Sequence, residues 1–267
     1  MQPTPTGLLG IVESAEAIGR HLVVDPTPEI ALAASSRPLG ELLLACINAG
    51  ATELLVGLGG SATTDGGRGV FDVLRQHRGL AVPMTIACDV DVAFLGALDF
   101  AAQKGIAPDD LPQVAKQLHD TAAHFHATTG IDPTLTAGAG AAGGVAGALF
   151  CLGGALASGA ELVVEKSGLG VALDTATVLI TGEGALDATS LRGKVVGHLL
   201  ASTPPTCVLI IIAGTADTQT MNDIAQLRPG THIVVLDRVV GLDAALRKPL
   251  AVASSLLDKL LFAPRAI

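Results

Sequence analysis

The sequence predicts an α/β protein built on parallel sheets. Apolar runs of strand length alternate along the chain with longer segments of helical periodicity, and strands joined by helices pair in parallel through right-handed crossovers. The runs TVLIT, CVLIII and HIVVLD are continuously apolar, which is typical of strands covered on both faces. We expect strands at residues 9–12, 53–58, 84–89, 161–165, 177–181, 207–213 and 232–237. We expect helices at residues 38–49, 66–76, 108–128, 142–157, 190–201, 218–226 and 242–261.

The last three predicted strands form a regular β-α-β-α-β-α unit from residue 175 onward. An open doubly wound sheet usually has about five strands, and three parallel strands bury little apolar surface by themselves. We therefore expect this sheet to be incomplete. Either the first half of the chain supplies neighbouring strands, or strands are missing.

Composition limits the partners that this chain can bind. The 267 residues carry a net charge of -9, and aromatic residues make up 2% of them, with no Trp and no Tyr. Nucleic-acid binding needs a basic surface, and base stacking needs aromatic side chains. We therefore expect neither nucleic acid nor an anionic membrane as a partner. A small anion can still bind where backbone N–H groups and one or two lysines form a local site.

Cysteine usage and the N-terminal residues indicate a cytoplasmic protein. The cysteines lie in separate apolar segments and are typical of reduced core residues; they are Cys46, Cys88, Cys151 and Cys207. MQPTPTGLLG lacks the basic start and apolar run of a signal peptide. The uncharged segment 137–160 is long enough to span a bilayer. It consists mostly of Gly and Ala, so we interpret it as a buried helix.

Carboxylates follow three of the predicted strands, at the sheet edge where parallel sheets bind ligands. In chain order they are Asp65 in GGSATTDGG, Asp89 in CDVD, and Glu183 and Asp187 in GEGALD. Glycine after a strand lets backbone N–H groups approach a ligand oxygen, and a helix N-terminus adds partial positive charge. Carboxylates beside such an anion site favour Mg²⁺ with a nucleotide. The pattern indicates phosphoryl transfer; the alternative is a tight turn where helix and strand pack closely.

Other phosphate-binding motifs do not explain the sequence. No G-x-x-x-x-G-K-[ST] pattern occurs in it. Gly138, Gly140 and Gly143 match G-x-G-x-x-G, but the preceding GIDPTLT is not a buried strand. A dinucleotide-binding fingerprint requires that strand, so we do not interpret these glycines as a dehydrogenase site.

A series of longer motifs follows the order of a known family. They are GLGGSATTDGG from Gly57, ACDVD from Ala87, QKG from Gln103, GAGAAGG from Gly138, ASGAELVVE from Ala157 and ITGEGALDATSLRGK from Ile180. Together with the less specific VESAEAIGRHLV, they resemble the bacterial type I glycerate kinase family. The resemblance implies ATP- and Mg²⁺-dependent phosphorylation of D-glycerate to phosphoglycerate. It also implies a flavodoxin-like domain interrupted by a second α/β domain, with the active site in the cleft between them.

On this resemblance we expect two domains. Residues 1–173 correspond to the family's inserted α/β domain, which is expected to bind substrate or an anion. Residues 174–267 correspond to the C-terminal portion of a flavodoxin-like (Rossmann-like) parallel-sheet domain that is incomplete at its N-terminus. The family's PDSFKGS-like and DGGEGT-like N-terminal loops have no counterpart here. Val92, Ala185 and Thr189 replace an Asn, an Arg and a Gln of the family motifs.

The resemblance also assigns roles to individual residues. Gly59, Gly60, Ser61, Thr63, Gly182, Gly184 and Ser190 are the expected substrate and phosphate ligands. Asp65, Asp89, Lys104 and Lys194 are the expected catalytic residues, and Glu183 and Asp187 the expected Mg²⁺ ligands. The alternatives are structural: a tight turn for the first glycine loop, helix caps for Asp65 and Asp187, a solvated acid for Asp89 and a surface lysine for Lys104.

Two other classes of function are compatible with the sequence. One is a truncated or non-catalytic relative that binds glycerate or nucleotide without turnover. The other is a structural subunit in which an uncovered sheet edge pairs with a partner chain, and a homo-oligomer would be one such arrangement. Solution mass distinguishes the second class from an enzyme.

Overall fold

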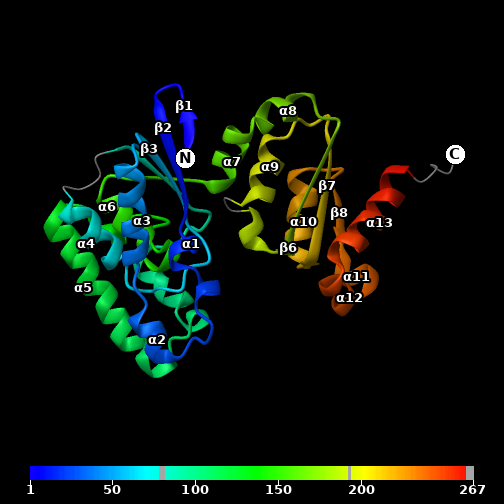
Figure 1. The fold of residues 1–267 in the computed structure, drawn as a ribbon. Coiled ribbons are helices and arrows are strands. Elements are labelled where there is room, and N and C mark those ends of the chain that lie inside the picture. The colour runs from blue at the N-terminus through cyan, green and yellow to red at the C-terminus, as the bar shows by residue number, and fades with distance from the viewer. Residues whose placement is uncertain (78–81, 192–193, 263–267) are drawn as a thin grey trace. The chain divides into compact units, whose positions relative to one another are not determined.

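The computed structural model describes residues 1–77, 82–191 and 194–262 (Figure 1). The chain folds into two compact units, Met1–Gly159 and Ala160–Ile267. The first contains a five-stranded mixed sheet and the second a three-stranded parallel sheet. The protein is therefore an α/β protein, as the sequence predicts. The second unit begins at Ala160, earlier than the boundary at residue 174 that the sequence suggests. Helix α7 (Gly159–Ser167) packs with this unit, and Oε1 of Glu161 in α7 lies 3.9 Å from Nδ1 of His198.

The sheet of the first unit has the strand order β1-β2-β3-β4-β5. Its strands are β1 (Gln2–Thr4), β2 (Gly7–Glu13), β3 (Glu53–Gly57), β4 (Met84–Ala87) and β5 (Ala155–Ala157). β1 pairs with β2 in antiparallel orientation, and all other pairs are parallel. The carboxyl ends of β2, β3 and β4 therefore meet at one edge of the sheet.

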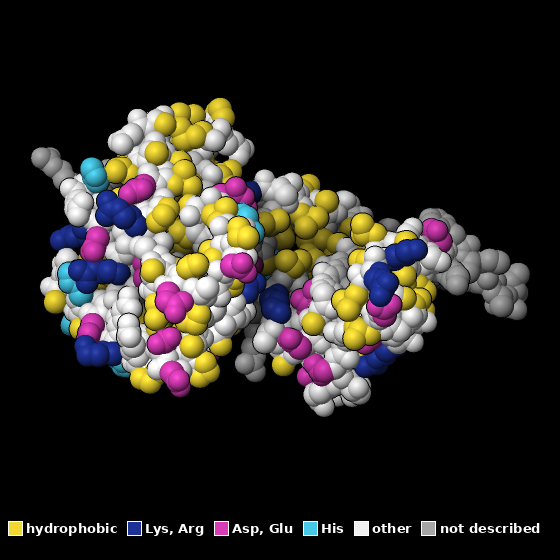
Figure 2. Space-filling model, turned by 60° about the horizontal axis from the view of Figure 1, so that its bottom comes forward, with side chains coloured by type: hydrophobic (Ala, Val, Ile, Leu, Met, Phe, Trp, Pro, Cys, Tyr) yellow, Lys and Arg dark blue, Asp and Glu magenta, His cyan; other side chains and the backbone are white. Residues whose placement is uncertain are grey.

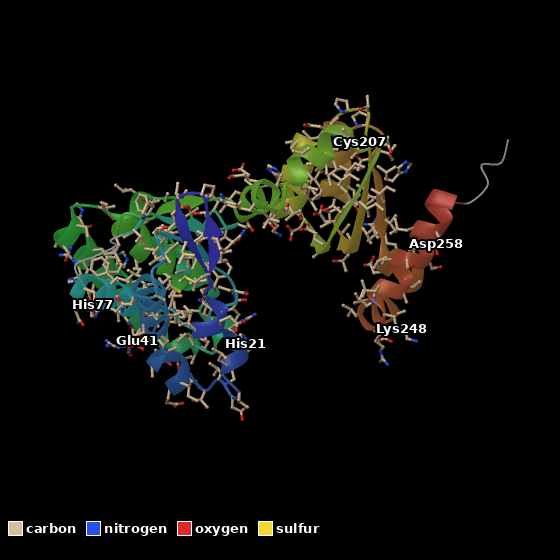
Figure 3. All side chains as sticks on the ribbon, turned by 45° about the horizontal axis from the view of Figure 1, so that its top comes forward. His21, Glu41, His77, Cys207, Lys248 and Asp258 are labelled. Carbon is tan, nitrogen blue, oxygen red and sulfur yellow. The ribbon has the colours of Figure 1, made fainter. Side chains whose placement is uncertain are left out.

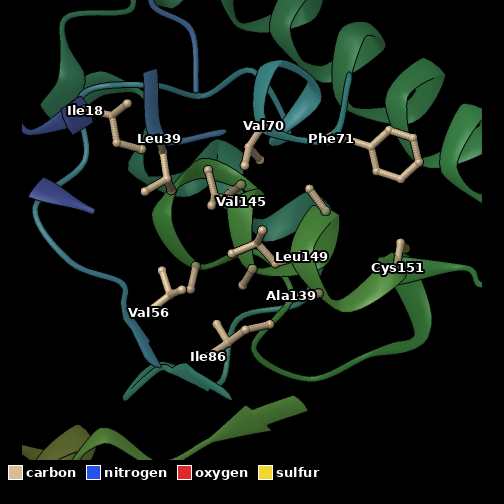
Figure 4. Packing of buried hydrophobic residues seen from close by; sticks show 14 of the residues in the cluster. Ile18, Leu39, Val56, Val70, Phe71, Ile86, Ala139, Val145, Leu149 and Cys151 are labelled. Carbon is tan, nitrogen blue, oxygen red and sulfur yellow. The ribbon is translucent and has the colours of Figure 1, made fainter. Parts of the chain in front are cut away.

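Helices pack against this sheet and form the first core. They are α1 (Ala15–Ile18), α2 (Pro28–Ala33), α3 (Arg37–Asn48), α4 (Arg68–Gln76), α5 (Leu111–Thr129) and α6 (Val145–Cys151). Short 3-10 helices are Arg20–Leu22, Phe94–Phe100, Ala102–Lys104, Pro108–Asp110, Pro133–Leu135 and Ala141–Gly143. Figure 4 shows Val145 and Leu149 of α6 between Val56 and Ile86 of the sheet and Leu39 of α3, and all five side chains are fully buried.

The second unit contains three strands in the order β6-β7-β8. They are β6 (Val178–Leu186), β7 (Val208–Ala216) and β8 (His232–Val235). The helices are α7, α8 (Leu169–Thr175), α9 (Val195–Ser202), α10 (Thr218–Leu227), α11 (Leu236–Val240), α12 (Leu242–Arg247) and α13 (Pro249–Phe262), with a 3-10 turn at Ala188–Leu191. Within the described residues, no strand of the first unit joins this sheet.

Three predicted elements are wrong. Residues 161–165 lie in helix α7 and not in a strand. The helix predicted at 142–157 ends at Cys151, and Gly153, at a φ of 97°, reverses the chain so that Ala155–Ala157 pair with β4. The helix predicted at 242–261 is divided into α12 and α13, because Pro249 cannot donate the hydrogen bond that would continue α12.

The uncharged segment 137–160 contributes α6 and β5 to the first core, as a buried segment and not as a long helix. One stretch of the described residues, Pro28–Asn48, is apolar and long enough by composition to cross a membrane. It is interrupted at Ala34, whose backbone is extended between α2 and α3. Leu39 and Leu43 of α3 are fully buried in the core.

The cysteines are free thiols. Cys151 and Cys207 are buried, and Figure 3 shows Cys207 at the start of β7. Burial raises the pKa of the Cys151 thiol to about 11 and also raises the pKa of the half-buried Cys88. These thiols are therefore protonated and unreactive near neutral pH.

Candidate functional site

A pocket of about 260 Å³ opens in the first unit, at the edge of the sheet where β3 and β4 end. The glycine loop after β3, the segment after β4 and two later loops form its wall. The lining residues are Arg20, Leu58, Gly59, Gly60, Ser61, Val90, Val92, Phe100, Gln103, Lys104, Gly140, Ala141, Ala142 and Gly143. The pocket thus lies at the edge where the sequence predicts a ligand.

Close packing between two glycine-rich loops shapes the pocket. Gly143 has a φ of 75°, and a Cβ at this position would collide with the carbonyl oxygen of Thr63. The amide of Gly66 also donates to the carbonyl of Gly143 over 3.0 Å. Ala142, in the same wall, has a φ of 53°, a region that residues other than glycine seldom adopt. Gly143 therefore allows the two glycine-rich loops to pack closely.

Lys104 supplies a buried positive charge to this pocket. Only 8% of the surface of this residue is exposed to solvent. Its Nζ donates to the carbonyl of Thr63 at 2.7 Å and to the hydroxyl of Ser61 at 3.1 Å. Burial disfavours the charged form and lowers the pKa of Lys104 to about 8, although the charge of Asp65 acts in the opposite direction. Lys104 is therefore not the surface lysine of the structural alternative.

Asp65 is held by the protein and does not line the pocket. Its Oδ2 accepts hydrogen bonds from the amide and hydroxyl of Ser36, at 2.7 and 2.8 Å, and from the amide of Gly69 at 3.2 Å. Its Oδ1 accepts from the amide of Gly67 at 2.9 Å. These contacts join the start of α4 to the start of α3, and they match the helix-cap alternative.

The other predicted residues of the first unit differ in position. Gly59, Gly60 and Ser61 line the pocket, but the Gly59 amide donates to the hydroxyl of Ser14 at 3.3 Å. Thr63 is buried, and its hydroxyl donates to the carbonyl of Ala34 at 3.0 Å. Asp89 is exposed after β4 and lies outside the lining. The structure thus brings Gly59, Gly60, Ser61 and Lys104 together around the pocket, without Thr63, Asp65 and Asp89.

In the second unit, Ser190 connects the two predicted metal ligands at the carboxyl end of β6. It is fully buried. Its hydroxyl donates a short hydrogen bond to the Glu183 carboxylate and accepts one from the Asp187 amide at 3.0 Å. Asp187 Oδ1 accepts from the amide and hydroxyl of Thr189, at 2.8 and 2.5 Å, and these bonds lower the pKa of Asp187. Lys194 directly precedes α9.

A second, more apolar pocket of about 490 Å³ adjoins this cluster. Thr181, Gly182, Glu183 and Gly184 of β6 contribute to its lining, and residues of β7, α11, α12 and α13 form the rest. A Cβ at Gly182 would collide with the carbonyl of Ile212, so this glycine is required by strand packing. Ser190, Asp187 and Lys194 do not line the pocket.

Comparison with known proteins decides the family. A model of the glycerate kinase family matches residues 4–78 and 74–260. The chain belongs to the glycerate kinase family. An uncharacterized protein of Mycobacterium bovis, Mb2228c, is 39% identical over 221 residues, which cover 79% of this chain and 58% of that protein. Glycerate 2-kinase of Escherichia coli K12 is 31% identical over 227 residues, which cover 71% of this chain and 58% of that protein.

The fold agrees with this assignment. A crystal structure assigned as glycerate kinase 2 from Salmonella typhimurium LT2 aligns with a TM-score of 0.64 at 24% identity, over 95% of this chain and 77% of that one. The chain spans 58% of the length of the curated relatives described above. The resemblance expected from the motifs is therefore confirmed for the glycerate kinase family.

Members of the glycerate kinase family are expected to use Mg²⁺. The acidic side chains of this chain show how such an ion could be held. Within the described part of the chain, no group of three or more His, Cys, Asp or Glu side chains could hold a metal ion. Mg²⁺ usually binds one or two carboxylates together with waters and substrate phosphates. Glu183 and Asp187 supply two carboxylates. They fit an ion that arrives with nucleotide phosphates and not one held by protein ligands alone.

Sequence reasoning missed several residues of the first pocket. Arg20, Gln103 and Phe100 line it, as do Gly140 and its neighbours. Two of these carried a signal, because Gln103 begins the QKG motif and Gly140 lies in GAGAAGG. Arg20 lies in the less specific block VESAEAIGRHLV, and only the folded chain places it beside Lys104.

Proposed function

We propose that this chain is a glycerate kinase that transfers a phosphoryl group from ATP to a hydroxyl of D-glycerate and produces phosphoglycerate. The observation that carries the proposal is the buried amino group of Lys104 beside Ser61, in a pocket whose lining contains no acidic residue. Membership of the glycerate kinase family and the name of the Escherichia coli relative, glycerate 2-kinase, support the same activity.

The residues of the first pocket would bind and orient the acceptor. Positioning and charge stabilisation account for most of the catalysis of phosphoryl transfer. The protonated amine of Lys104 and the hydroxyl of Ser61 would donate to an anionic oxygen, while Val90, Val92 and Phe100 supply apolar parts of the lining. Asp89, which directly precedes Val90, is the candidate base for the acceptor hydroxyl.

The second unit would bind the nucleotide. Gly184 and Lys194 are the proposed phosphate contacts, and Glu183 and Asp187 would hold Mg²⁺. Gly182 packs against Ile212 and Ser190 is fully buried, so these two residues would position the loop and not contact phosphate directly. When bound, Mg²⁺ would neutralise negative charge on the phosphates.

We assign the first unit to the family's inserted domain and the second to the C-terminal part of a flavodoxin-like domain. We also place the protein in the cytoplasm, as a possible homo-oligomer. On the face shown in Figure 2, Lys and Arg lie among acidic and apolar side chains and form no continuous basic surface.

The activity is tested by mass-spectrometric detection of phosphoglycerate after incubation of the protein with D-glycerate, ATP and Mg²⁺. Lys104→Met keeps the length of the side chain and removes the charge. We expect it to lower kcat/KM by about 100-fold or more, as is typical of the loss of a buried donor to a transition-state anion. Lys116→Met is the matched control, because Lys116 is exposed on α5 and forms an ion pair with the exposed Asp120. We expect Lys116→Met to leave turnover unchanged.

The contacts of Asp65 favour a second candidate function, a relative that binds glycerate or nucleotide without turnover. The hydrogen bonds that its carboxylate accepts from Ser35, Ser36, Gly67 and Gly69 are all internal, so it is not a free catalytic carboxylate. Folded wild-type protein that binds glycerate but yields no phosphoglycerate would establish this candidate and contradict the kinase.

A further inference from the structure

The first pocket combines two positive side chains with a lining that contains no acidic residue. Arg20 and Lys104 both face it, and the remaining lining is glycine, small or apolar apart from Ser61 and Gln103. The whole chain carries a net charge of -9. Two cations at one small pocket are therefore opposite in sign to the average surface, and such a local field attracts an anion.

Backbone contacts fix the position of Arg20. Its amide donates to the carbonyl of Gly60 at 2.8 Å, and Gly19, directly before it, forms a β-bridge with Ser61. The guanidinium Nη1 donates to the carbonyl of Gln103 at 3.3 Å. Arg20 is thus tied to the glycine loop at one end and to the residue before Lys104 at the other. Its guanidinium has five N–H groups, and within the described residues it donates no hydrogen bond besides the one to Gln103.

No carboxylate pairs with either cation among the ion pairs of the described residues. Asp65 influences Lys104 electrostatically, but its oxygens accept hydrogen bonds from Ser36, Gly67 and Gly69. Among the residues that the structure describes, Lys104 donates to the neutral oxygens of Ser61 and Thr63 and to no others. The positive charge at this pocket is therefore not neutralised by the protein and can be neutralised by a bound anion.

We propose that Arg20 and Lys104 together bind one carboxylate group, that of a small 2-hydroxy acid, and that Arg20 is the residue that selects the acid over the corresponding neutral polyol. The inference rests on the proposed function, because it names the group of the acceptor that the first pocket recognises. A guanidinium presents paired N–H donors whose spacing matches the two oxygens of a carboxylate, whereas an ammonium group acts as a point charge.

The size of the pocket supports a small ligand. Pockets for drug-sized molecules measure about 300–1,000 Å³, and this pocket measures about 260 Å³. Val90, Val92 and Phe100 supply apolar lining, and the charged and hydroxyl groups of the lining come from Arg20, Lys104 and Ser61. A neutral polyol would displace water from two cations without neutralising them, and this penalty is the source of selectivity.

The test is isothermal titration calorimetry of D-glycerate, glycerol and inorganic phosphate, without nucleotide. The proteins are the wild type, Arg20→Gln, Arg20→Lys and Arg75→Gln. Arg75→Gln is the matched control, because it removes the same charge from an exposed position on α4 outside the pocket. We expect Arg20→Gln to raise the Kd for D-glycerate by about tenfold or more, as for the loss of a charge-assisted hydrogen bond. Arg20→Lys should raise it less, and Arg75→Gln should not change it.

Several results would overturn the inference. They are equal Kd values for D-glycerate in the wild type and Arg20→Gln, glycerol binding as tight as that of D-glycerate, and phosphate binding with no binding of D-glycerate. Far-UV circular dichroism and thermal unfolding show whether each variant is folded. Because the titration contains no ATP, Arg20-dependent binding without phosphoglycerate formation would leave this inference standing and contradict only the kinase.

Discussion

The amino group of Lys104 donates a hydrogen bond to the carbonyl of Thr63 over 2.7 Å inside the first unit. This bond joins the 3-10 helix Ala102–Lys104 to the loop that follows β3. Gly143 packs against the same carbonyl. The cation of the candidate site is therefore held by the two glycine-rich loops that form its walls, and changes in either loop should reach it.

The charge state of Lys104 should make stability depend on pH. Its pKa in the folded protein is about 8, and that of an unfolded lysine is about 10.4. Between these values the unfolded chain keeps a proton that the folded chain has released, so the free energy of unfolding should rise with pH across this window. Urea unfolding of the wild type and Lys104→Met on both sides of the window measures the effect. A pH-independent difference between the two proteins would contradict it.

Asp65→Asn should destabilise the first unit. Asn cannot accept at both positions that now receive hydrogen bonds from Ser36, Gly67 and Gly69, so we expect the free energy of unfolding to fall by about 2 kcal/mol. Asp72→Asn is the control, because Asp72 forms a half-exposed i,i+4 pair with Arg68, and it should lose less than about 1 kcal/mol. An Asp65→Asn protein as stable as the wild type but without activity would instead support a catalytic role.

Alanine at Gly143 and at Gly153 should separate collision from backbone strain. Both residues have positive φ, 75° and 97°, but only at Gly143 would a Cβ meet other atoms, those of Thr63 and Lys104. We expect Gly153→Ala to cost about 1 kcal/mol and Gly143→Ala at least about 2 kcal/mol more. Thermal or urea unfolding measures both. Equal losses would show that the two loops are not closely packed.

Ser190→Ala should destabilise the second unit. The hydroxyl of Ser190 is buried between the carboxylate of Glu183 and the amide of Asp187, and its removal leaves both without this partner. We expect a loss of about 1–3 kcal/mol in the free energy of unfolding. Ser202→Ala removes an exposed hydroxyl that donates to the backbone carbonyl of His198, and it should change stability by less than about 0.5 kcal/mol. Similar losses in the two variants would refute a structural role for Ser190.

The strands were largely predictable from the sequence, and the short ambiguous runs were not. TVLIT and CVLIII are apolar throughout and form β6 and β7 as predicted. The inference that both faces of these strands are covered is wrong for β6, because Val178 and Ile180 are exposed. ELVVE is equally compatible with a helix and a strand, since a short apolar run has no decisive periodicity. Pairing with β4 makes Ala155–Ala157 a strand, and that pairing is tertiary.

The same division between local sequence signals and tertiary contacts applies to the candidate site. By itself the sequence determined the α/β class, the glycine-rich loop after β3 and the motifs of the glycerate kinase family, because these depend on residues that are close together along the chain. Only the tertiary structure decided that Asp65 is bound by Ser36 and that Arg20 lies beside Lys104. These contacts join segments far apart in sequence, and they form because the parallel sheet brings the ends of β2 and β3 to the same edge.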